Sequence, residues 1–354
     1  MDKDIKKSAM PEKKKDPKPN ASGTELKKPL RKKTSVSKTK KAPAKAKTSK
    51  NPKSDDSAKT LDKDSSHVSK IKETPSDSAS SGIENKPIHQ EKKKHSFPSE
   101  IEPTTKYIYS LKGKRSIVGL TAYDAIMSKL VSKAGVDFIL VGDSVGTTLL
   151  GYETTVPVTI DDMVHHTSAV KRGMPECLVV ADLPFGEASF SFDRLLESSR
   201  RLMQSGADAV KIEGGKDVAD DIEKLVATGI PVMGHIGLLP QTVKAIGGYR
   251  KFGTDRVEAD SIYTDAICLE EAGCFAIIAE MIDGKLATEL TKQILPPLIG
   301  IGSGDHCDGQ ILVTHDLLGL TPSPLPSFVK PCASLGLDGL NALQRYVHRI
   351  RSMK

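Results

Sequence analysis

Downstream of a polar N-terminal region, the chain alternates short apolar runs with amphipathic segments. The run Phe138–Val141 ends at a glycine, and Asp143 and Ser144 follow. Its β-branched content and abrupt end favour a buried parallel strand, although a run this short also suits part of a buried helix. The pattern recurs in Leu178–Asp182 and Ala209–Glu213, each of which closes on an acidic residue. The pattern therefore predicts three strands whose ends each present a carboxylate.

Further apolar runs bring the expected number of strands to eight. Helical patterns separate them: we expect one helix to run from Asp124 to a stop at Gly135, and another to begin at Thr159 with two acids in its first turn. A loop is expected over 146–155. Eight right-handed strand–helix units in about 230 residues predict an α/β fold, a closed (β/α)8 TIM barrel. The expected strands cover residues 116–122, 138–141, 178–182, 209–213, 231–235, 275–280, 297–302 and 310–314.

An open, doubly wound parallel sheet is the alternative fold. No Gly-x-Gly-x-x-Gly pattern follows the first apolar run, so the sequence gives no support for dinucleotide binding. A late glycine-rich segment, Gly300 to Gly304, is consistent with a phosphate site or simply with a tight turn.

Composition divides the chain in two. The first hundred residues carry 27 Lys and Arg against 14 Asp and Glu, whereas the remainder has a net negative charge. A segment so polar cannot bury enough apolar surface to offset its chain entropy. We therefore predict a disordered Lys/Ser/Pro-rich tail over residues 1–98 and a barrel catalytic domain over residues 99–354.

The basic tail has two interpretations. Its lysine runs would attract nucleic acid or another acidic partner in a salt-sensitive manner, or they form a solvated tail that aids solubility. No secretory signal or membrane-spanning run is evident. The five cysteines form no Cys-x-x-Cys pair, which indicates reduced thiols in a cytoplasmic protein.

The strand ends together predict an enzyme site. The carboxyl ends of parallel strands meet on one face, and converging carboxylates repel each other unless a cation lies between them. Oxygen ligands without His or Cys suit Mg²⁺ better than Zn²⁺. The residues expected on this face are Asp143, Ser144, Asp182, Lys211, Glu213, His235 and Glu280.

Three of these residues allow more than one role. Lys211 lies two positions before Glu213, so both side chains point to the same side of the strand. There, Lys211 either forms a buried ion pair or binds a substrate carboxylate or a developing oxyanion. His235 is either a hydrogen-bonded core residue or a catalytic one. Glu280 ends a strand of its own, which suits a general base better than a further metal ligand.

Several motifs resemble those of the ketopantoate hydroxymethyltransferase family, within the wider group of phosphoenolpyruvate mutase and isocitrate lyase barrels. The resemblance extends from about residue 104 to residue 320. The matching stretches are Leu120-Thr-Ala-Tyr-Asp124, Val141-Gly-Asp-Ser144, Ala181-Asp-Leu-Pro-Phe185, Lys211-Ile-Glu-Gly-Gly215, Gly234-His-Ile-Gly-Leu238 and Gly300-Ile-Gly-Ser-Gly304.

The resemblance implies a Mg²⁺-dependent transfer of a one-carbon unit from 5,10-methylenetetrahydrofolate to 3-methyl-2-oxobutanoate. By position, it implies that Asp143, Asp182 and Glu213 bind the metal and that Glu280 accepts the C3 proton. It also implies a homo-oligomer, for which a decamer is expected. The residues implied to bind substrate are Asp143, Ser144, Asp182, Lys211 and His235. Another Mg²⁺-dependent carbon–carbon lyase or mutase of the same barrel group is the alternative function.

Two stretches depart from the family pattern. The chain ends in a segment from Tyr346 to Lys354 where we expect Pro-Gly-Glu-His-Ser, and Phe252 occupies a loop position where we expect an amide side chain. Subunit contacts or site closure are therefore expected to differ at the C-terminus, and folate recognition near Phe252.

Overall fold

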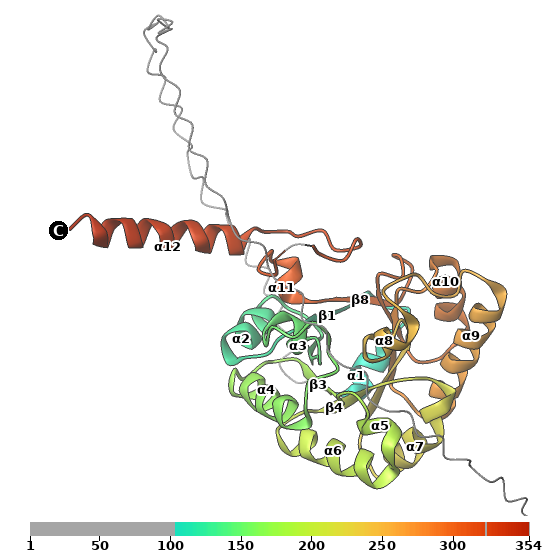
Figure 1. Cartoon of the computed structure of the whole chain (residues 1–354). Coiled ribbons are helices and arrows are strands. Elements are labelled where there is room, and N and C mark those ends of the chain that lie inside the picture. Colours follow the sequence, from blue (N-terminus) through green and yellow to red (C-terminus); the bar gives the residue numbers. More distant parts are fainter. Residues whose placement is uncertain (1–102, 323, 354) are drawn as a thin grey trace, which may run out of the picture. The chain divides into compact units, whose positions relative to one another are not determined.

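The eight strands form a closed barrel. The computed structural model describes residues 103–322 and 324–353. Every strand pairs in parallel with the next, and β8 returns to pair with β1, which confirms the predicted TIM barrel and excludes the open sheet (Figure 1). The strands are β1 (Ile117–Thr121), β2 (Phe138–Val141), β3 (Leu178–Asp182), β4 (Ala209–Glu213), β5 (Val232–Gly237), β6 (Ala276–Glu280), β7 (Leu298–Ile301) and β8 (Gly309–Leu312).

The predicted disordered tail, residues 1–98, lies outside the described residues. In the part of the chain that is described, no helix has the length and apolar content that crossing a bilayer requires.

Apolar side chains fill two layers. One cluster lies inside the barrel, where the fully buried ring of Phe138 faces Gly119 on the neighbouring strand. A larger cluster lies between the strands and the surrounding helices and includes Ile139 and Val141. Alternate residues of one strand thus enter different layers, as the two-residue period of a strand requires. Burying one such side chain contributes roughly 1.5–3 kcal/mol.

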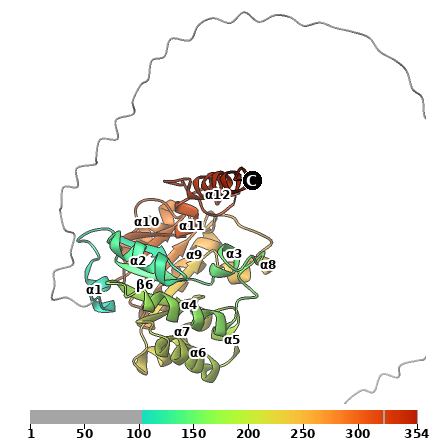
Figure 2. The same cartoon turned by 90° about the vertical axis from the view of Figure 1, so that its left-hand side faces the viewer.

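Helices surround the strands (Figures 1 and 2). Two expected helix starts are confirmed: the side chain of Asp124 accepts hydrogen bonds from two backbone N–H groups of α2, and Thr159 and Asp162 form a capping box at α4. The helices are α1 (Thr105–Ser110), α2 (Ala125–Lys133), α3 (Val145–Thr148), α4 (Ile160–Arg172), α5 (Glu187–Phe190), α6 (Phe192–Gln204), α7 (Lys216–Ala227), the 3-10 turn η1 (Pro240–Thr242), α8 (Val243–Ile246), α9 (Arg256–Glu271), α10 (Gly284–Gln293), α11 (Thr314–Leu317) and α12 (Leu335–Arg351).

Two local expectations differ from the structure. The expected loop over 146–155 begins with the short helix α3, because the chain turns helical immediately after Ser144. The expected helix between the last two strands does not form: within the described residues, β7 connects to β8 through the non-helical segment 302–308. The barrel is therefore closed as a sheet, but it lacks one of the eight helices expected around it.

Candidate active site

A cavity of about 610 Å³ opens at the carboxyl ends of the strands. Because the strands are parallel, the last side chains of every strand lie at this one end of the barrel. Residues that are far apart in the sequence are therefore neighbours in space. All seven predicted site residues line the cavity, which they enter from β2 to β6 and the turns that follow: Asp143, Ser144, Asp182, Lys211, Glu213, His235 and Glu280.

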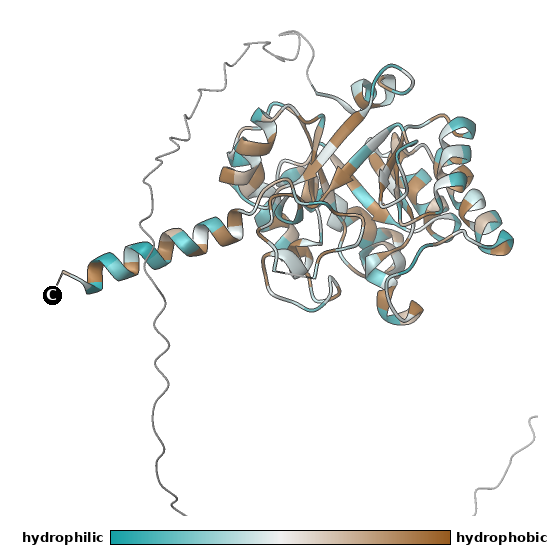
Figure 3. Ribbon diagram, turned by 90° about the horizontal axis from the view of Figure 1, so that it is seen from above, coloured by the Kyte–Doolittle hydropathy of each residue, from teal (hydrophilic) through white to brown (hydrophobic). Residues whose placement is uncertain are grey.

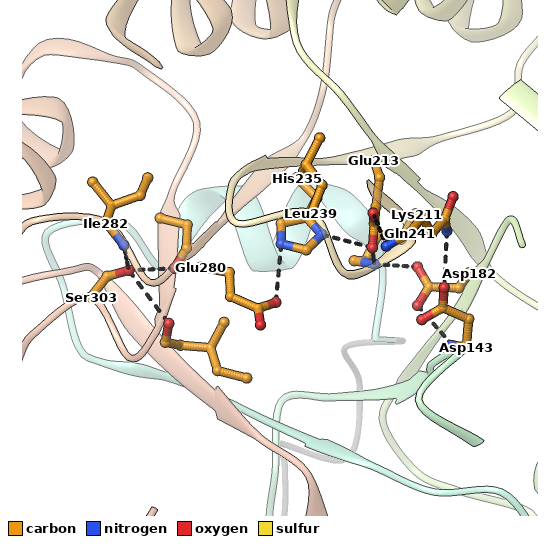
Figure 4. A network of polar contacts seen from close by, with 12 residues as sticks. Asp143, Asp182, Lys211, Glu213, His235, Leu239, Gln241, Glu280, Ile282 and Ser303 are labelled. Carbon is orange, nitrogen blue, oxygen red and sulfur yellow. Dashed lines mark hydrogen bonds and ion pairs between the residues drawn. The ribbon is translucent and has the colours of Figure 1, made fainter. Parts of the chain in front are cut away.

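One side of the cavity is a buried ion cluster (Figure 4). Lys211 Nζ lies 2.5 Å from Asp182 Oδ1 and 3.9 Å from Glu213 Oε1. The other oxygen of Asp182 accepts a hydrogen bond of 3.0 Å from the backbone N–H of Asp143. The side chains of Asp182 and Lys211 are almost fully buried. Each charge therefore depends largely on the others for compensation, because little of either side chain is exposed to solvent.

His235 lies between two carboxylates. Its Nδ1 is 3.5 Å from Glu213 Oε1, and its Nε2 is 3.3 Å from Glu280 Oε2. Figure 4 shows the imidazole between these two side chains. Within the described residues, neither ring nitrogen has a partner in hydrogen-bond geometry. Each ring nitrogen of His235 therefore faces a carboxylate at the lining of the cavity.

Burial changes the acid–base properties of this site. It raises the pKa of Glu213 to about 7, with the positive charge of Lys211 opposing the rise. Burial also raises the pKa of Asp143, which the nearby Asp182 and Glu213 raise further. The pKa of Glu280 is raised for the same reason, while its contact with His235 acts in the opposite direction. A carboxylate whose pKa is raised towards neutral is a stronger base than an exposed one.

The two basic groups of the site respond differently to burial. Burial lowers the pKa of Lys211, but the charges of Asp182, Glu213 and Asp143 outweigh that effect, so its pKa is raised and it stays protonated. Burial and the positive charge of Lys211 lower the pKa of His235, which favours the neutral imidazole. The cavity thus holds one permanent positive charge, Lys211, among several carboxylates.

The carboxylates match a divalent cation in ligand type. Asp143, Asp182 and Glu213 supply only oxygen, which Mg²⁺ prefers, and Glu213 Oε1 is buried without a hydrogen-bond partner among residues 103–322 and 324–353. Among these described residues, no group of three or more His, Cys, Asp or Glu side chains is already arranged so that it could hold a metal ion.

Two residues of this site were not predicted as such. Gln241 Nε2 donates hydrogen bonds to Asp143 Oδ2 (3.0 Å) and to the carbonyl of Leu183 (2.9 Å), while its backbone N–H donates to Glu213 Oε2 (3.2 Å). The fully buried Tyr123 forms a 2.9 Å hydrogen bond between its hydroxyl and Ser144 Oγ. Tyr123 lies within one of the quoted motifs, whereas Gln241 lies just beyond another, after Pro240.

Much of the remaining lining of the cavity is apolar. It includes Ile278 and Ile301 from the barrel, and Phe328 and Val329 from the segment that follows α11. Tyr249, from the loop after α8, also reaches the cavity. Burial raises the pKa of its hydroxyl, as do the nearby carboxylates, Glu280 first. The lining of the cavity therefore combines ionic groups with apolar side chains that suit a branched hydrocarbon group.

Two other sequence features lie away from this chemistry. Phe252 is 8% exposed and lies beneath the guanidinium of Arg250, 3.9 Å from the ring centroid, and it does not line the cavity. In the glycine-rich segment, Gly302 and Gly304 have positive φ, and the Ser303 hydroxyl donates to the carbonyl of Ala279 and accepts from the N–H of Ile282. These bonds favour the tight-turn interpretation of the segment.

Comparison with known proteins identifies the family. A profile of ketopantoate hydroxymethyltransferase matches residues 102–354. The chain belongs to this family.

Its relatives agree in sequence over most of their length. The 3-methyl-2-oxobutanoate hydroxymethyltransferase of Pseudothermotoga lettingae is 47% identical over 244 residues, which cover 69% of this chain and 92% of the relative. The enzyme of the same name from Caldivirga maquilingensis is 46% identical over 251 residues, which cover 71% of this chain and 94% of the relative. Among solved structures, phosphoenolpyruvate phosphomutase from Streptomyces platensis subsp. rosaceus is similar with a TM-score of 0.49 and 14% identity, over 70% of this chain and 88% of that one.

The chain is therefore an enzyme, and its region that matches the family carries the site described above. All seven residues predicted from the strand ends lie in the matched region. Their individual roles remain predictions.

Proposed function

We propose that this chain is a 3-methyl-2-oxobutanoate hydroxymethyltransferase of pantothenate biosynthesis. It transfers a hydroxymethyl group from 5,10-methylenetetrahydrofolate to 3-methyl-2-oxobutanoate and gives 2-dehydropantoate. The observation that carries the proposal is the placement of Glu280, a buried carboxylate with a raised pKa, in the same cavity as the cluster around Lys211. Family membership identifies the substrates that this placement suits.

Substrate binding is assigned to the ionic side of the cavity. Lys211 supplies the permanent positive charge that a 2-oxo acid requires, and Ser144, held by Tyr123, supplies a hydroxyl at the end of β2. His235, as the neutral imidazole, lies beside Glu280, where it contacts the substrate or product. The branched carbon chain then faces the apolar wall of the cavity.

Proton removal is assigned to Glu280. A carboxylate with a raised pKa takes the C3 proton more readily than an exposed glutamate would, and the charge of Lys211 offsets the negative charge that develops on the keto oxygen. Water supplies the hydroxyl oxygen: it adds to the methylene carbon of the folate, both carbon–nitrogen bonds of that carbon break, and formaldehyde and tetrahydrofolate are formed. The enolate carbon then adds to the formaldehyde carbon, and the alkoxide that results takes a proton from the protonated Glu280 to give the hydroxymethyl group.

Asp143, Asp182 and Glu213 would hold Mg²⁺ in this site, with Asp143 and Asp182 also contacting the substrate. When bound, a divalent cation polarises the keto group and stabilises the enolate charge. The ligand type of these residues and the unpartnered oxygen of Glu213 support this assignment.

The decisive experiment follows exchange of the C3 proton of 3-methyl-2-oxobutanoate for deuterium by NMR, with Mg²⁺ present and folate absent. We expect exchange with the unaltered chain and a loss of at least 100-fold in Glu280→Gln, because a general base contributes about 10²–10⁴-fold. Glu289→Gln, an exposed position on α10 outside the cavity, is the matched control. Equal exchange in both variants would refute the role of Glu280. Failure of the unaltered chain to form 2-dehydropantoate with both substrates would refute the function.

Two further assignments accompany this function. We assign the chain to the cytoplasm and to a homo-oligomer, with a decamer expected from the family resemblance. Sedimentation velocity of the full chain tests the oligomer, and fluorescence microscopy of a tagged chain tests the compartment.

A further inference from the structure

Asp316 is an acidic residue of the cavity that the proposed reaction does not use. Among the described residues, five acidic side chains line the cavity, and four of them, Asp143, Asp182, Glu213 and Glu280, already have assigned roles. The fifth, Asp316, lies in α11 shortly after β8 and is 8% exposed. Within residues 103–322 and 324–353, its carboxylate takes part in no hydrogen bond and in no ion pair.

The charge of Asp316 has no basic partner in the described part of the chain. Lys211 is the one Lys or Arg of that part that lines the cavity, and it belongs to the ion cluster with Asp182. Burial lowers the pKa of the neighbouring His315, which favours its neutral form, although the charges of Asp124 and Asp316 oppose this effect. A buried carboxylate without a partner is costly, so a ligand that donates hydrogen bonds to it is stabilised there.

Hydrogen bonds hold the start of α11 at the end of β1. Thr314 N–H donates to Thr121 Oγ1 (3.1 Å), and the Thr314 hydroxyl donates to the carbonyl of Thr121 (2.5 Å). The charge of Asp316 therefore reaches Tyr123: burial raises the pKa of Tyr123 to about 12, its hydrogen bond with Ser144 opposes the rise, and Asp316 adds to it. Because Tyr123 also holds Ser144, Asp316 lies near the place assigned to the 2-oxo acid.

The lining around Asp316 suits a flat polar ring. Leu312 and Val313, which precede α11, line the same cavity with apolar side chains. Figure 3 shows brown, apolar positions along the strands of the barrel, from whose carboxyl ends this lining continues. Thr155 also lines the cavity and is 4% exposed, and its Oγ1 has no hydrogen-bond partner among the described residues. Apolar walls with a few polar groups are typical of sites that orient a heteroaromatic ligand.

The hydrogen-bonding groups of the two substrates show which part can face Asp316. The 2-oxo acid presents only acceptor oxygens, and the glutamate tail of the folate is anionic, so a carboxylate would repel both. The pterin ring of the folate instead carries N3–H and a 2-amino group side by side on one edge. A carboxylate accepts two parallel N–H bonds of this kind, as it does from a guanidinium.

We propose that Asp316 binds the pterin ring of 5,10-methylenetetrahydrofolate by accepting hydrogen bonds from N3–H and the 2-amino group. The inference rests on the proposed function and adds the residue that selects the co-substrate. The cavity of about 610 Å³ has room for this ring beside the small 2-oxo acid, since sites for larger organic ligands measure roughly 300–1,000 Å³. Phe252, near which the sequence predicted a difference in folate recognition, does not line the cavity.

The test measures binding of two ligands to the full chain by anaerobic calorimetry: tetrahydrofolate, and its 2-desamino-2-methyl analogue, which lacks one of the two donors. We expect the unaltered chain to bind tetrahydrofolate about 10–100-fold more tightly, as the loss of a hydrogen bond to a charged group predicts. In Asp316→Asn the difference should fall below about three-fold, because the amide oxygen is uncharged and the amide nitrogen is itself a donor. Asp193→Asn, at an exposed position of α6 outside the cavity, is the matched control and should retain the full difference.

Two results would overturn the role of Asp316: equal binding of both ligands by the unaltered chain, or a difference in Asp316→Asn as large as in the control. Asp316→Ser replaces Asp316→Asn if the latter alters the circular dichroism spectrum, and the same two results apply to it.

The turnover assay separates this inference from the proposed function. A chain that forms 2-dehydropantoate but binds both ligands equally would refute the role of Asp316 alone. A chain that distinguishes the ligands through Asp316 but forms no 2-dehydropantoate would refute the function and support the pterin site.

Discussion

At the scale of single residues, the site depends on how burial sets charge. Lys211 remains protonated because three carboxylates surround it, and burial raises the pKa of Glu213 to about 7. The same burial raises the pKa of Glu280 at the other side of His235. The cavity therefore combines a fixed cation with a strengthened base, which is the combination that enolisation of a 2-oxo acid requires.

Gln241 should be a positioning residue. Gln241→Ala removes the hydrogen bond to Asp143 Oδ2 and leaves that buried carboxylate with fewer partners. We expect Mg²⁺ affinity, measured by calorimetry without substrate, to fall about 10–100-fold, which corresponds to the roughly 1–3 kcal/mol of an unsatisfied buried group. Gln293→Ala, at the exposed end of α10, is the control. Equal Mg²⁺ affinity in both variants would show that Gln241 does not position Asp143.

Mg²⁺ binding should weaken as the pH falls. The pKa of Glu213 is about 7 and that of Asp143 is raised, so both take up protons within a range where exposed carboxylates stay charged. A ligand must lose its proton to bind metal, so binding is strongest above pH 7 and declines below it. Calorimetric titration at pH 8 and at pH 6 should show at least a several-fold loss at the lower pH. Equal affinity at both values would contradict the assignment of Glu213.

At the scale of elements, the barrel interior is set by close approach between neighbouring strands. Gly119 on β1 pairs with Phe138 on β2, and a Cβ at Gly119 would lie 2.2 Å from the ring of Phe138. The glycine therefore makes room for an aromatic ring that fills the barrel. The sequence showed the strand but not this contact, because the pairing joins positions that are distant along the chain.

Gly119→Ala should destabilise the barrel. The new methyl group would force the Phe138 ring or a strand to shift, and overpacking of this kind costs about 1–3 kcal/mol. Denaturant unfolding followed by circular dichroism measures the change. Gly284→Ala, at the start of α10, meets no atom closer than 3.7 Å and is expected to be neutral or slightly stabilising. A loss of stability as large at Gly284 as at Gly119 would rule out the packing explanation.

At the scale of the whole molecule, the region that matches the family covers only part of the chain. The family match begins at residue 102, and the aligned residues of two relatives cover 92% and 94% of those relatives but only 69% and 71% of this chain. A chain shortened to residues 99–354 should therefore retain the turnover rate of the full chain within about two-fold in the same assay. A larger loss would show that the N-terminal region takes part in catalysis.

The same shortened chain tests the basic tail. If the lysine runs bind nucleic acid, the full chain should show affinity for it that falls steeply with salt concentration, and the shortened chain should lose that affinity. Affinity that is the same in both chains, or absent from both, would support the solubility interpretation of the tail.

The sequence by itself determined the barrel and the chemistry available to it. Apolar runs that end on Asp143, Asp182, Glu213 or Glu280 indicate both the strands and the groups at their ends, because strand period and turn residues are local properties. Parallel strands then bring those ends together as a matter of topology. For this reason all seven candidate residues could be named before their distances were known.

The tertiary structure decided what depends on contacts between distant residues. Gln241 donates a hydrogen bond to Asp143, and Tyr123 forms one with Ser144. His235 lies between two glutamates. These contacts follow from strand pairing and from the paths of the loops, which no local sequence pattern encodes. The non-helical connection between β7 and β8 and, among the described residues, the exposure of the apolar side chains of α12 likewise appeared only in three dimensions. Local sequence fixes which faces are apolar, and the fold determines which of them find a partner within the chain.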